Sequence, residues 1–410
     1  MHDIAAQPHP DAPPLVIVGA GPVGLVAALA ARHRGLPVVV VEAEPEDRTR
    51  PGSRATFVFR ESLDLLERIA PGVTEPLVDR SRAWLDLRTT YAGREVYHHR
   101  FPPAPRGQFG ISLSQRDQEA VLLDRCHAEA VEFRWANGVA QVATDADGAT
   151  LTLEDASTIR AEYVVAADGA RSSVRRCLGI GMDGGRSESS FIIVDVEDAP
   201  ENPMSLTRSF HYRHPAVGGR NVLMVPFGGG WRLDLECNPG DDVEHFASEP
   251  GLSAWITAVA GPGYAERRAW SSVYRFNHSV ATSYTDPHAR VLLAGEAAHL
   301  FPPFGGGRGL NSGIPDAVFE VDAVAEALAA ERPAAAADII ARAATERRAA
   351  GLLNRDAASA ALVHMEGRGR VTRARQRLAA LLAPHSERFG KWLDRAPMGP
   401  TVPVNSRSRF

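Results

Sequence analysis

The sequence predicts an α/β protein that starts with a nucleotide-binding βαβ unit, carries an inserted β-rich domain and ends in a helical region. Three observations predict this class. A short apolar strand at 15–18 leads into GAGPVG and then into an alanine- and leucine-rich helix ending near Gly35. Strand-like segments separated by Gly and Pro fill 181–285. Helix-forming sequence dominates after Ile314.

Composition restricts the partners. The 410 residues exceed the usual size of one hydrophobic core. A formal charge of -5 gives no basic footprint for nucleic acid. Cys126, Cys177 and Cys237 are odd in number and form no CxxC pair, so we expect packed thiols in a reducing compartment and no metal site. The first residues show no basic apolar leader, and the apolar runs are too short to span a bilayer. We therefore expect a cytoplasmic protein without a membrane partner.

The first glycine motif carries the nucleotide prediction. Gly19 permits a tight turn, Gly21 lets a pyrophosphate approach the backbone, and Gly24 packs helix on strand. Glu42 follows the second strand, where a carboxylate can accept hydrogen bonds from both ribose hydroxyls. The spacing predicts dinucleotide binding and leaves NAD or FAD open. The whole loop consists of Gly19, Ala20, Gly21, Pro22, Val23 and Gly24.

Two further strand ends also carry a glycine and an acid. Asp168 follows the strand at 163–167, and Gly295 with Glu296 follows the strand at 291–294. A glycine run at 305–309 then leads into a helix start, whose free amides favour anionic atoms. Three such strand ends exceed what one NAD-type nucleotide needs. They suit a longer cofactor with a ribityl chain and a flavin ring.

Five segments together resemble one known family. They are GAGPVG with Glu42, Ser53-Arg54-Ala55 leading into RESLDLLERI, DGARSSVRRCLGI, GEAAHLFPP with RGLNSGIPDA, and more weakly SQRDQEAVLLDRC. They resemble the class A flavoprotein aromatic monooxygenases, the para-hydroxybenzoate hydroxylase-like group, over 15–365. The resemblance implies a glutathione reductase-type, Rossmann-like FAD-binding domain with noncovalent FAD. It also implies NADH or NADPH as reductant and O2 activated as a flavin C4a-hydroperoxide, which hydroxylates a phenolic or other electron-rich aromatic substrate.

The resemblance also implies roles for individual residues. Arg54 and Gln115 would contact the pyrophosphate and ribityl region, Asp168 would shape the pyrophosphate pocket, and Gly295 with Glu296 would reach a ribityl hydroxyl. The flavin pyrimidine edge would meet the backbone amides of Gly309, Leu310 and Asn311.

Two positions depart from the family pattern. Glu296 stands where relatives usually have Asp, and the GGGRG run is one glycine longer and contains Arg308. Arg308 either anchors an anionic substrate or faces solvent. With Pro303, which would flank the substrate cavity, it is a candidate catalytic residue. His299 is expected to be structural, satisfying a backbone carbonyl.

The sequence also suggests domain limits and substrate contacts. The FAD-binding domain is expected over 15–79, 108–180 and 286–331, after a flexible tail at 1–14. The β-rich substrate domain would take 80–107 and 181–285, and the helical region 332–410. The candidate substrate contacts are aromatic or cationic residues of the β-rich domain, although each is more typical of packing: Tyr212, Phe227, Trp231 and Arg232.

Other functions stay open on sequence alone. A halogenase or reductase of the same fold is one alternative, although no WxWxIP sequence is present and Lys391, the only lysine, lies far from the nucleotide motif. An NAD-dependent dehydrogenase would leave Asp168 and Glu296 unexplained. A catalytically silent flavin-binding regulator is the third.

Overall fold

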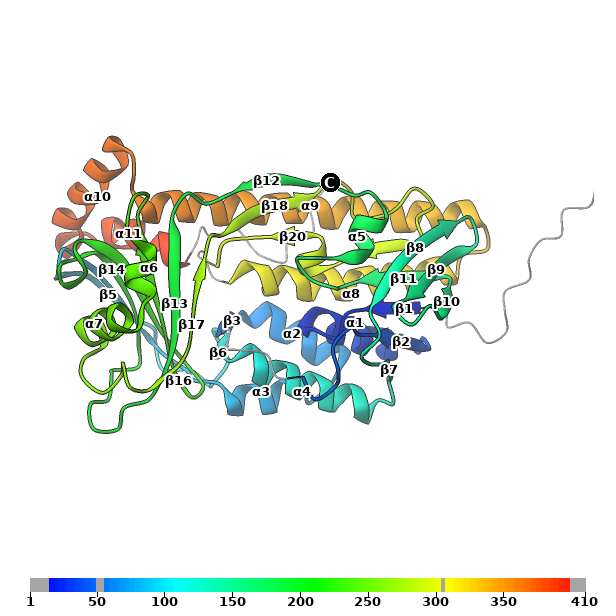
Figure 1. Ribbon diagram of the computed structural model, residues 1–410, viewed down its shortest axis with the longest axis horizontal. Helices are drawn as coiled ribbons and strands as arrows, with labels where there is room; N and C mark the ends of the chain where they lie inside the picture. The colour runs from blue at the N-terminus through cyan, green and yellow to red at the C-terminus, as the bar shows by residue number, and fades with distance from the viewer. Residues whose placement is uncertain (1–14, 49–54, 304–306, 399–410) are drawn as a thin grey trace, which may run out of the picture.

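The computed structural model describes residues 15–48, 55–303 and 307–398 (Figure 1). One half of the molecule, the parallel-sheet half, is built on a five-stranded parallel sheet in the order β19-β11-β1-β2-β7. Its first four strands are buried apolar runs, as expected where helices cover a parallel sheet. Their carboxyl ends meet at one edge, although they come from distant parts of the chain. The strands are β1 (Leu15–Val18), β2 (Val38–Val41), β7 (Glu132–Arg134), β11 (Tyr163–Ala166) and β19 (Val291–Leu293).

Helices cover this sheet. α1 connects β1 to β2, as the predicted βαβ unit requires, and packs against α4 and α8. α2 is amphipathic and turns its apolar side toward α8. The helices of this half are α1 (Pro22–His33), α2 (Arg60–Ile69), α3 (Thr74–Arg80), α4 (Gln115–Ala128), α5 (Ser173–Cys177) and α8 (Arg308–Leu328).

Three small sheets accompany the parallel sheet. β8 (Val139–Asp145) and β9 (Gly148–Leu153) form a hairpin, which β10 (Thr158–Ala161) extends. β3 (Thr56–Val58) pairs with β6 (Ile111–Leu113). A third sheet joins the two halves of the molecule and consists of β12 (Met182–Arg186), β18 (Asn277–Ala281) and β20 (His299–Leu300).

The other half, the large-sheet half, is built on seven strands in the order β17-β13-β16-β15-β14-β4-β5. One face packs on α7 around Trp231 and Trp255, and the other face packs on α10 and α11 around Phe210 and Tyr212. The strands are β4 (Asp86–Tyr91), β5 (Arg94–Arg100), β13 (Ser190–Glu197), β14 (Thr207–His214), β15 (Arg220–Phe227), β16 (Gly230–Cys237) and β17 (Arg268–Tyr274). They fall inside the two ranges expected for the β-rich domain.

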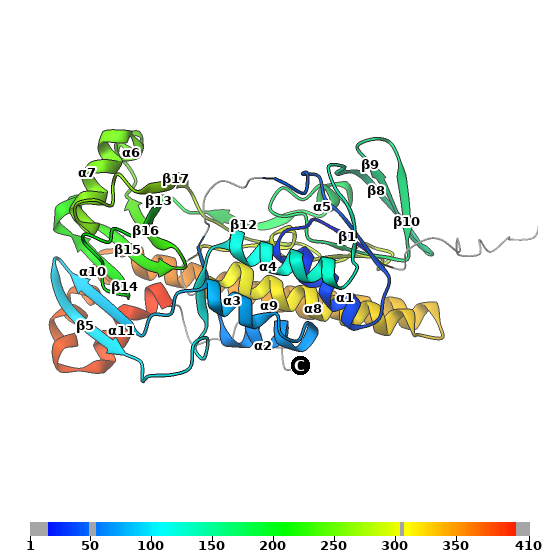
Figure 2. The ribbon, with the colours of Figure 1, turned by 90° about the horizontal axis from the view of Figure 1, so that it is seen from below.

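The long helix α9 (Pro333–Glu366) runs along both halves, as Figures 1 and 2 show. It packs against α8 and β18 and reaches α11 at its far end. The remaining helices are α6 (Val243–Ala247), α7 (Glu249–Ala260), α10 (Arg370–Leu382), α11 (Glu387–Met398) and the short turns η1 (Pro215–Val217), η2 (Gly295–Ala297) and η3 (Ala383–His385).

The α/β fold class with a helical C-terminal region is confirmed. Both α6 and α7 lie within the stretch expected to be β-rich, so these two helices were not expected. Cys177 is exposed, so the expectation of three packed thiols was wrong for that residue. The expected tail at 1–14 lies outside the described residues.

Candidate cofactor site

The glycine loop after β1 is shaped for backbone contact. Gly19 has φ +103°, and a Cβ there would lie 2.5 Å from the Ala167 carbonyl oxygen. A Cβ on Gly24 would lie 1.8 Å from the carbonyl oxygen of Gly19. Only glycine fits either position. Gly21 is the N-cap of α1, Pro22 opens the helix, and the first amides of α1 therefore face the loop.

Glu42 is held in place at the end of β2. Its Oε2 accepts a hydrogen bond from the Ala20 amide at 2.6 Å, and its Oε1 accepts one from the Glu44 amide at 3.0 Å. A carboxylate has roughly four acceptor positions, so capacity for a ligand's hydroxyls remains. Arg48, which the sequence analysis missed, donates from Nη2 to the Ala20 carbonyl oxygen at 2.7 Å. It places a cation beside the loop, and its position six residues after Glu42 was the available signal.

Asp168 lies at the end of β11 with one oxygen engaged and one without a partner among the described residues. Its Oδ2 accepts a hydrogen bond from the Val174 amide at 3.1 Å, whereas Oδ1 is buried and unpaired. Burial raises the pKa of this carboxyl. An unpaired buried oxygen beside a glycine loop is a place where a bound ligand can supply the missing hydrogen bond.

The turn after β19 is packed directly against the glycine loop. Gly295 has φ +59°, and a Cβ there would lie 2.9 Å from Cγ2 of Val23. The same Val23 atom would lie 2.6 Å from a Cβ on Gly313 of α8. Glu296 is exposed at this junction. The structure thus brings Glu296, the glycine loop and α8 together, as expected.

α8 begins at Arg308, directly after Gly307, which has a left-handed conformation. The Gly309 and Leu310 amides lie in its first turn, where no intrahelical acceptor exists. A Cβ on Gly309 would meet nothing within 4 Å, so open space lies beside it. The Asn311 amide differs, since it donates to the Gly307 carbonyl oxygen at 3.4 Å. The expectation that all three amides face a ligand was therefore wrong for Asn311.

The Asn311 side chain has a structural role. Its Oδ1 accepts hydrogen bonds from the Phe59 amide at 2.9 Å and from Ser62 Oγ at 2.8 Å. Its Nδ2 donates to the carbonyl oxygens of Phe57 at 2.7 Å and Gly307 at 2.9 Å. Asn311 thereby fixes β3 and α2 to the start of α8.

A buried ionic network supports the same turn. Asp316 of α8 accepts hydrogen bonds from His299 Nε2 at 2.8 Å, Arg347 Nε at 2.7 Å and the Gly295 amide at 3.2 Å. Burial alone would raise the pKa of Asp316, but the charges of Arg347 and His299 hold it below its ordinary value. His299 contacts a carboxylate rather than the expected backbone carbonyl.

The remaining cofactor candidates divide in two. Gln115 opens α4 and donates from Nε2 to Glu119 Oε1 at 2.7 Å, and Arg48 lies 4.0 Å from Glu119 on the other side. Gln115 is thus connected to the glycine loop through two side chains. Arg54 lies outside the described residues, as do Gly305 and Gly306.

Two of the four substrate candidates belong to the core. The Trp231 ring packs against α7, and its Nε1 donates to Asp198 Oδ1 at 3.2 Å. The Tyr212 hydroxyl donates to the Leu393 carbonyl oxygen at 2.8 Å beneath α11. Both side chains are at most 2% exposed. Their assignment as substrate contacts was wrong, because both side chains are buried against the helices that cover the sheet.

The other two candidates share the opposite sheet face from Trp231. Arg232 alternates with Trp231 along β16, and its Nη1 donates to the Ala55 carbonyl oxygen at 3.2 Å, so it points toward the parallel-sheet half. Two further bonds of 2.8 and 3.0 Å join it to Asp234. Phe227 has the same face by register and is buried.

The two catalytic candidates also differ. Arg308 is 2% exposed and donates from Nη1 to Asn354 Oδ1 of α9 at 2.6 Å. Burial lowers the pKa of its guanidinium to about 10. The solvent-facing alternative was therefore wrong, and Arg308 is engaged with α9. Pro303 is partly exposed at the edge of the described segment before α8.

The residues present fit an extended dinucleotide. Close-approach glycines, the unpaired Asp168 oxygen, the exposed Glu296 carboxylate and the open first turn of α8 lie along one edge of the sheet. Glu42 would hold the adenosine ribose and Glu296 the ribityl chain. Among the described residues, no three His, Cys, Asp or Glu side chains gather as a metal site would need, and no helix has the length and apolar character to cross a bilayer.

Comparisons with known proteins agree with this geometry. The family model described as "FAD binding domain" matches residues 13–356. Rifampicin monooxygenase of Streptomyces venezuelae is 29% identical over 317 residues, covering 74% of this chain and 62% of the relative. The 3-(3-hydroxy-phenyl)propionate/3-hydroxycinnamic acid hydroxylase of Mycolicibacterium smegmatis is 29% identical over 323 residues, covering 75% of this chain and 54% of the relative. The chain thus spans roughly half to three-fifths of these relatives.

A solved structure extends the likeness of fold. The p-nitrophenol 4-monooxygenase of Pseudomonas putida superposes with a TM-score of 0.76 at 23% identity, covering 95% of this chain and 99% of that one. This match shows the fold alone. Because the family model covers most of the sequence, the chain belongs to the FAD-binding-domain family, the class A flavoproteins that its motifs resemble, and FAD is its cofactor.

Proposed function

We propose that the protein is an FAD-dependent monooxygenase that hydroxylates a phenolic or other electron-rich aromatic substrate, with NADH or NADPH as reductant and O2 as co-substrate. The observation that carries the proposal is that three acid-bearing strand ends lie at one edge of the parallel sheet, where Gly295 and the α8 residue Gly313 pack against the glycine loop, in a chain of this family. The names of the curated relatives, a monooxygenase and a hydroxylase of phenolic acids, support the reaction class.

The chain's own residues bind and orient the cofactor. Glu42 is fixed by two backbone amides and would accept hydrogen bonds from the ribose hydroxyls, while the glycine loop and Arg48 would hold the pyrophosphate. Asp168 offers its unpaired oxygen. Glu296 would accept a hydrogen bond from the ribityl chain, and the Gly309 and Leu310 amides at the helix N-terminus would favour negative charge on the flavin's pyrimidine edge.

When bound, FAD supplies hydride acceptance from NAD(P)H and activation of O2 for transfer to the ring. The protein's contribution to that transfer is position and dryness, since an electron-rich ring needs little acid or base assistance. Pro303 would flank the ring beside the cofactor. Arg308, which is engaged with Asn354, would support the helix start from behind.

The substrate would lie between the two halves of the molecule. Arg232 and Phe227 occupy the sheet face turned toward Ala55, and we keep both as proposed substrate-side residues. The Arg232 charge is balanced by Asp234 at two hydrogen bonds. The site therefore presents Arg232 as a hydrogen-bonding group rather than as an uncompensated cation.

The test is a substrate screen on the purified protein. The proposal expects a yellow protein whose NAD(P)H oxidation and O2 consumption rise with a phenol and whose product contains oxygen from isotopically labelled O2. A protein that binds no flavin contradicts the proposal. Substrate-independent NAD(P)H oxidation without oxygen incorporation would instead indicate a reductase.

A further inference from the structure

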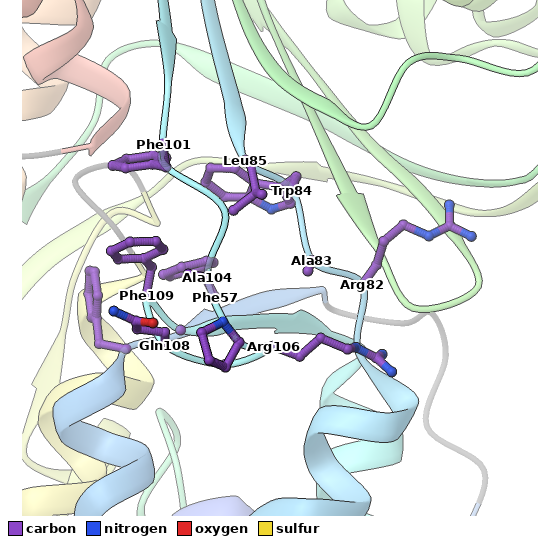
Figure 3. A pocket seen from close by; sticks show the side chains of 14 residues that line it. Phe57, Arg82, Ala83, Trp84, Leu85, Phe101, Ala104, Arg106, Gln108 and Phe109 are labelled. Atoms are coloured by element: carbon purple, nitrogen blue, oxygen red, sulfur yellow. The ribbon is translucent and has the colours of Figure 1, made fainter.

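An aromatic pocket lies where β3 meets the segments on either side of the β4–β5 hairpin (Figure 3). Its cavity measures about 110 Å³. An apolar cavity of about 150 Å³ holds a benzene molecule, so this space suits one aromatic ring with part of that ring open to solvent. Its walls are mainly ring, proline and glycine residues: Phe57, Phe59, Arg82, Ala83, Trp84, Leu85, Phe101, Ala104, Pro105, Arg106, Gly107, Gln108, Phe109 and Gly110.

The aromatic rings of the wall lie close enough together to pack against a ligand's ring in the pocket. The Phe57 ring centroid lies 5.3 Å from that of Trp84 and 5.4 Å from that of Phe59. The ring centroids of Phe101 and Phe109, which also line the pocket, are 5.1 Å apart, and Phe109 is 40% exposed. Aromatic pairs at such distances attract one another in tilted or edge-to-face arrangements. A planar ring between the two walls would contact both sets.

The two arginine side chains that line the pocket bind protein oxygens and do not point into it. Arg82 is bonded to both oxygens of Asp198, which raises the pKa of its guanidinium. Arg106 donates from Nη2 to the carbonyl oxygens of Val78 and Ser81 at 3.0 and 3.1 Å. Figure 3 shows both guanidinium groups pointing away from the rings. An anionic group placed among the rings would therefore lose water without meeting a cation.

Two polar groups of the wall can meet a ligand, the exposed amide of Gln108 and the buried indole N–H of Trp84. The Trp84 Nε1 is buried and has no hydrogen-bond partner among the described residues. A buried N–H donor without an acceptor is unfavourable, and a ligand's hydroxyl or carbonyl oxygen relieves that cost. Trp84 thus supplies a directional contact in the buried part of the wall.

The pocket is tied to the cofactor site. Its Phe57 carbonyl oxygen and Phe59 amide are both hydrogen-bonded to the side chain of Asn311 in the first turn of α8. A Cβ on Gly307 would lie 3.1 Å from the same Phe57 oxygen. The wall of the pocket is therefore fixed directly to the helix start that would face the flavin.

We propose that this pocket binds one ring of a planar, uncharged aromatic substrate, with the Trp84 indole N–H donating to a hydroxyl or carbonyl oxygen of that substrate. That the bound molecule is a substrate rests on the proposed function, whereas its binding to the pocket does not. The inference names a substrate class: neutral phenols and polycyclic ketones or phenols, in preference to aromatic carboxylates.

The experiment titrates the FAD-loaded protein with 1-naphthol and with 1-hydroxy-2-naphthoate, without NAD(P)H, and follows binding by calorimetry. These probes share a ring system and differ by a carboxylate. The inference expects 1-naphthol to bind at least about tenfold more tightly. Trp84→Phe, which keeps a ring and removes the N–H, should weaken 1-naphthol binding about tenfold, and Phe109→Ala, a change at an exposed ring, should weaken it several-fold. Trp392→Phe, at an indole of α11 that packs on His364, is the matched control and should stay within twofold.

Three results would overturn the inference: no binding of 1-naphthol, equal affinity for the carboxylate, or unchanged affinity in both Trp84→Phe and Phe109→Ala. Failure of the proposed function appears differently. Retained binding with no substrate-dependent O2 consumption contradicts the monooxygenase and leaves the pocket in place, while turnover with an unchanged KM in Trp84→Phe contradicts the pocket alone.

Discussion

The parallel-sheet half and the large-sheet half use their strands in different ways. In the first half, the proposed cofactor contacts lie at strand ends: Glu42, Asp168 and Glu296 each follow a strand, and the parallel order brings them to one edge. In the second half, side chains along the strands alternate between two covered faces, so Trp231 and Arg232 are neighbours in sequence and separate in space. The position of a residue at a strand end can be predicted from the sequence. The position of a residue within a strand can be assigned only once the helices that cover each face of the sheet are known.

The largest expected effect tests the network under the Gly295 turn. Asp316→Asn removes the charge that Arg347 and His299 share, leaving a buried guanidinium uncompensated. We expect a loss of about 3–5 kcal/mol in the free energy of unfolding, together with weaker FAD binding. Urea unfolding and FAD titration measure the two effects. Asp64→Asn, at an exposed pair with Arg60, is the control and should change stability by less than about 0.5 kcal/mol. Equal stability of the two variants would remove Asp316 from the account.

The next effect tests the glycine loop. Gly24→Ala places a Cβ 1.8 Å from the Gly19 carbonyl oxygen, and the backbone must move. We expect a cost of about 3 kcal/mol and a protein purified without its yellow colour. Gly369→Ala is the control, because a Cβ there meets only Thr372 Oγ1 at 3.7 Å. A Gly24→Ala protein that still binds a full complement of flavin would contradict the requirement for glycine at this position.

The next prediction concerns the pH dependence of stability in the large-sheet half, which contains two buried histidines. Burial lowers the pKa values of His211 and His364 to about 4, with smaller contributions from His214 and Arg395, and both histidines contact the large sheet or its covering helices. The unfolded chain takes up these protons near pH 6.5, so stability is lost as pH falls from about 6.5 to about 4. We expect about 2–3 kcal/mol for His211. Unfolding curves of wild type and His211→Gln across this range should converge toward acid, and parallel curves would contradict the assignment.

The smallest effect tests a corrected residue. Tyr212→Phe removes the hydrogen bond to the Leu393 carbonyl oxygen and should cost about 1 kcal/mol of stability. FAD affinity and substrate KM should not change, because the side chain lies beneath α11. A several-fold rise in KM with unchanged stability would return Tyr212 to the substrate site.

The difference between the halves also explains what the sequence could predict. The βαβ unit and the acids at the strand ends follow from local patterns that the structure reproduces. The start of α8 was placed late, because Gly307 caps the helix and Pro315 lies within it. α7 was missed because its helical segment stands among strands.

Tertiary packing decided the rest. Tyr212 and Trp231 have the chemistry of substrate contacts, and only α7 and α11 reveal that both are in the core. The aromatic pocket gathers rings from three separate segments around Phe57, Trp84 and Phe109. Its only local signal was the density of Phe at 57–59 and 101–109, which does not show that the segments meet.

The three strand ends are proposed to share one FAD, and calorimetric titration of the apoprotein with FAD tests this most directly at Glu296. Glu296→Asp retains a carboxylate and should bind within about twofold of wild type, whereas Glu296→Ala loses a charged hydrogen bond and should bind about tenfold more weakly. Equal FAD affinity in wild type and Glu296→Ala would contradict the claim.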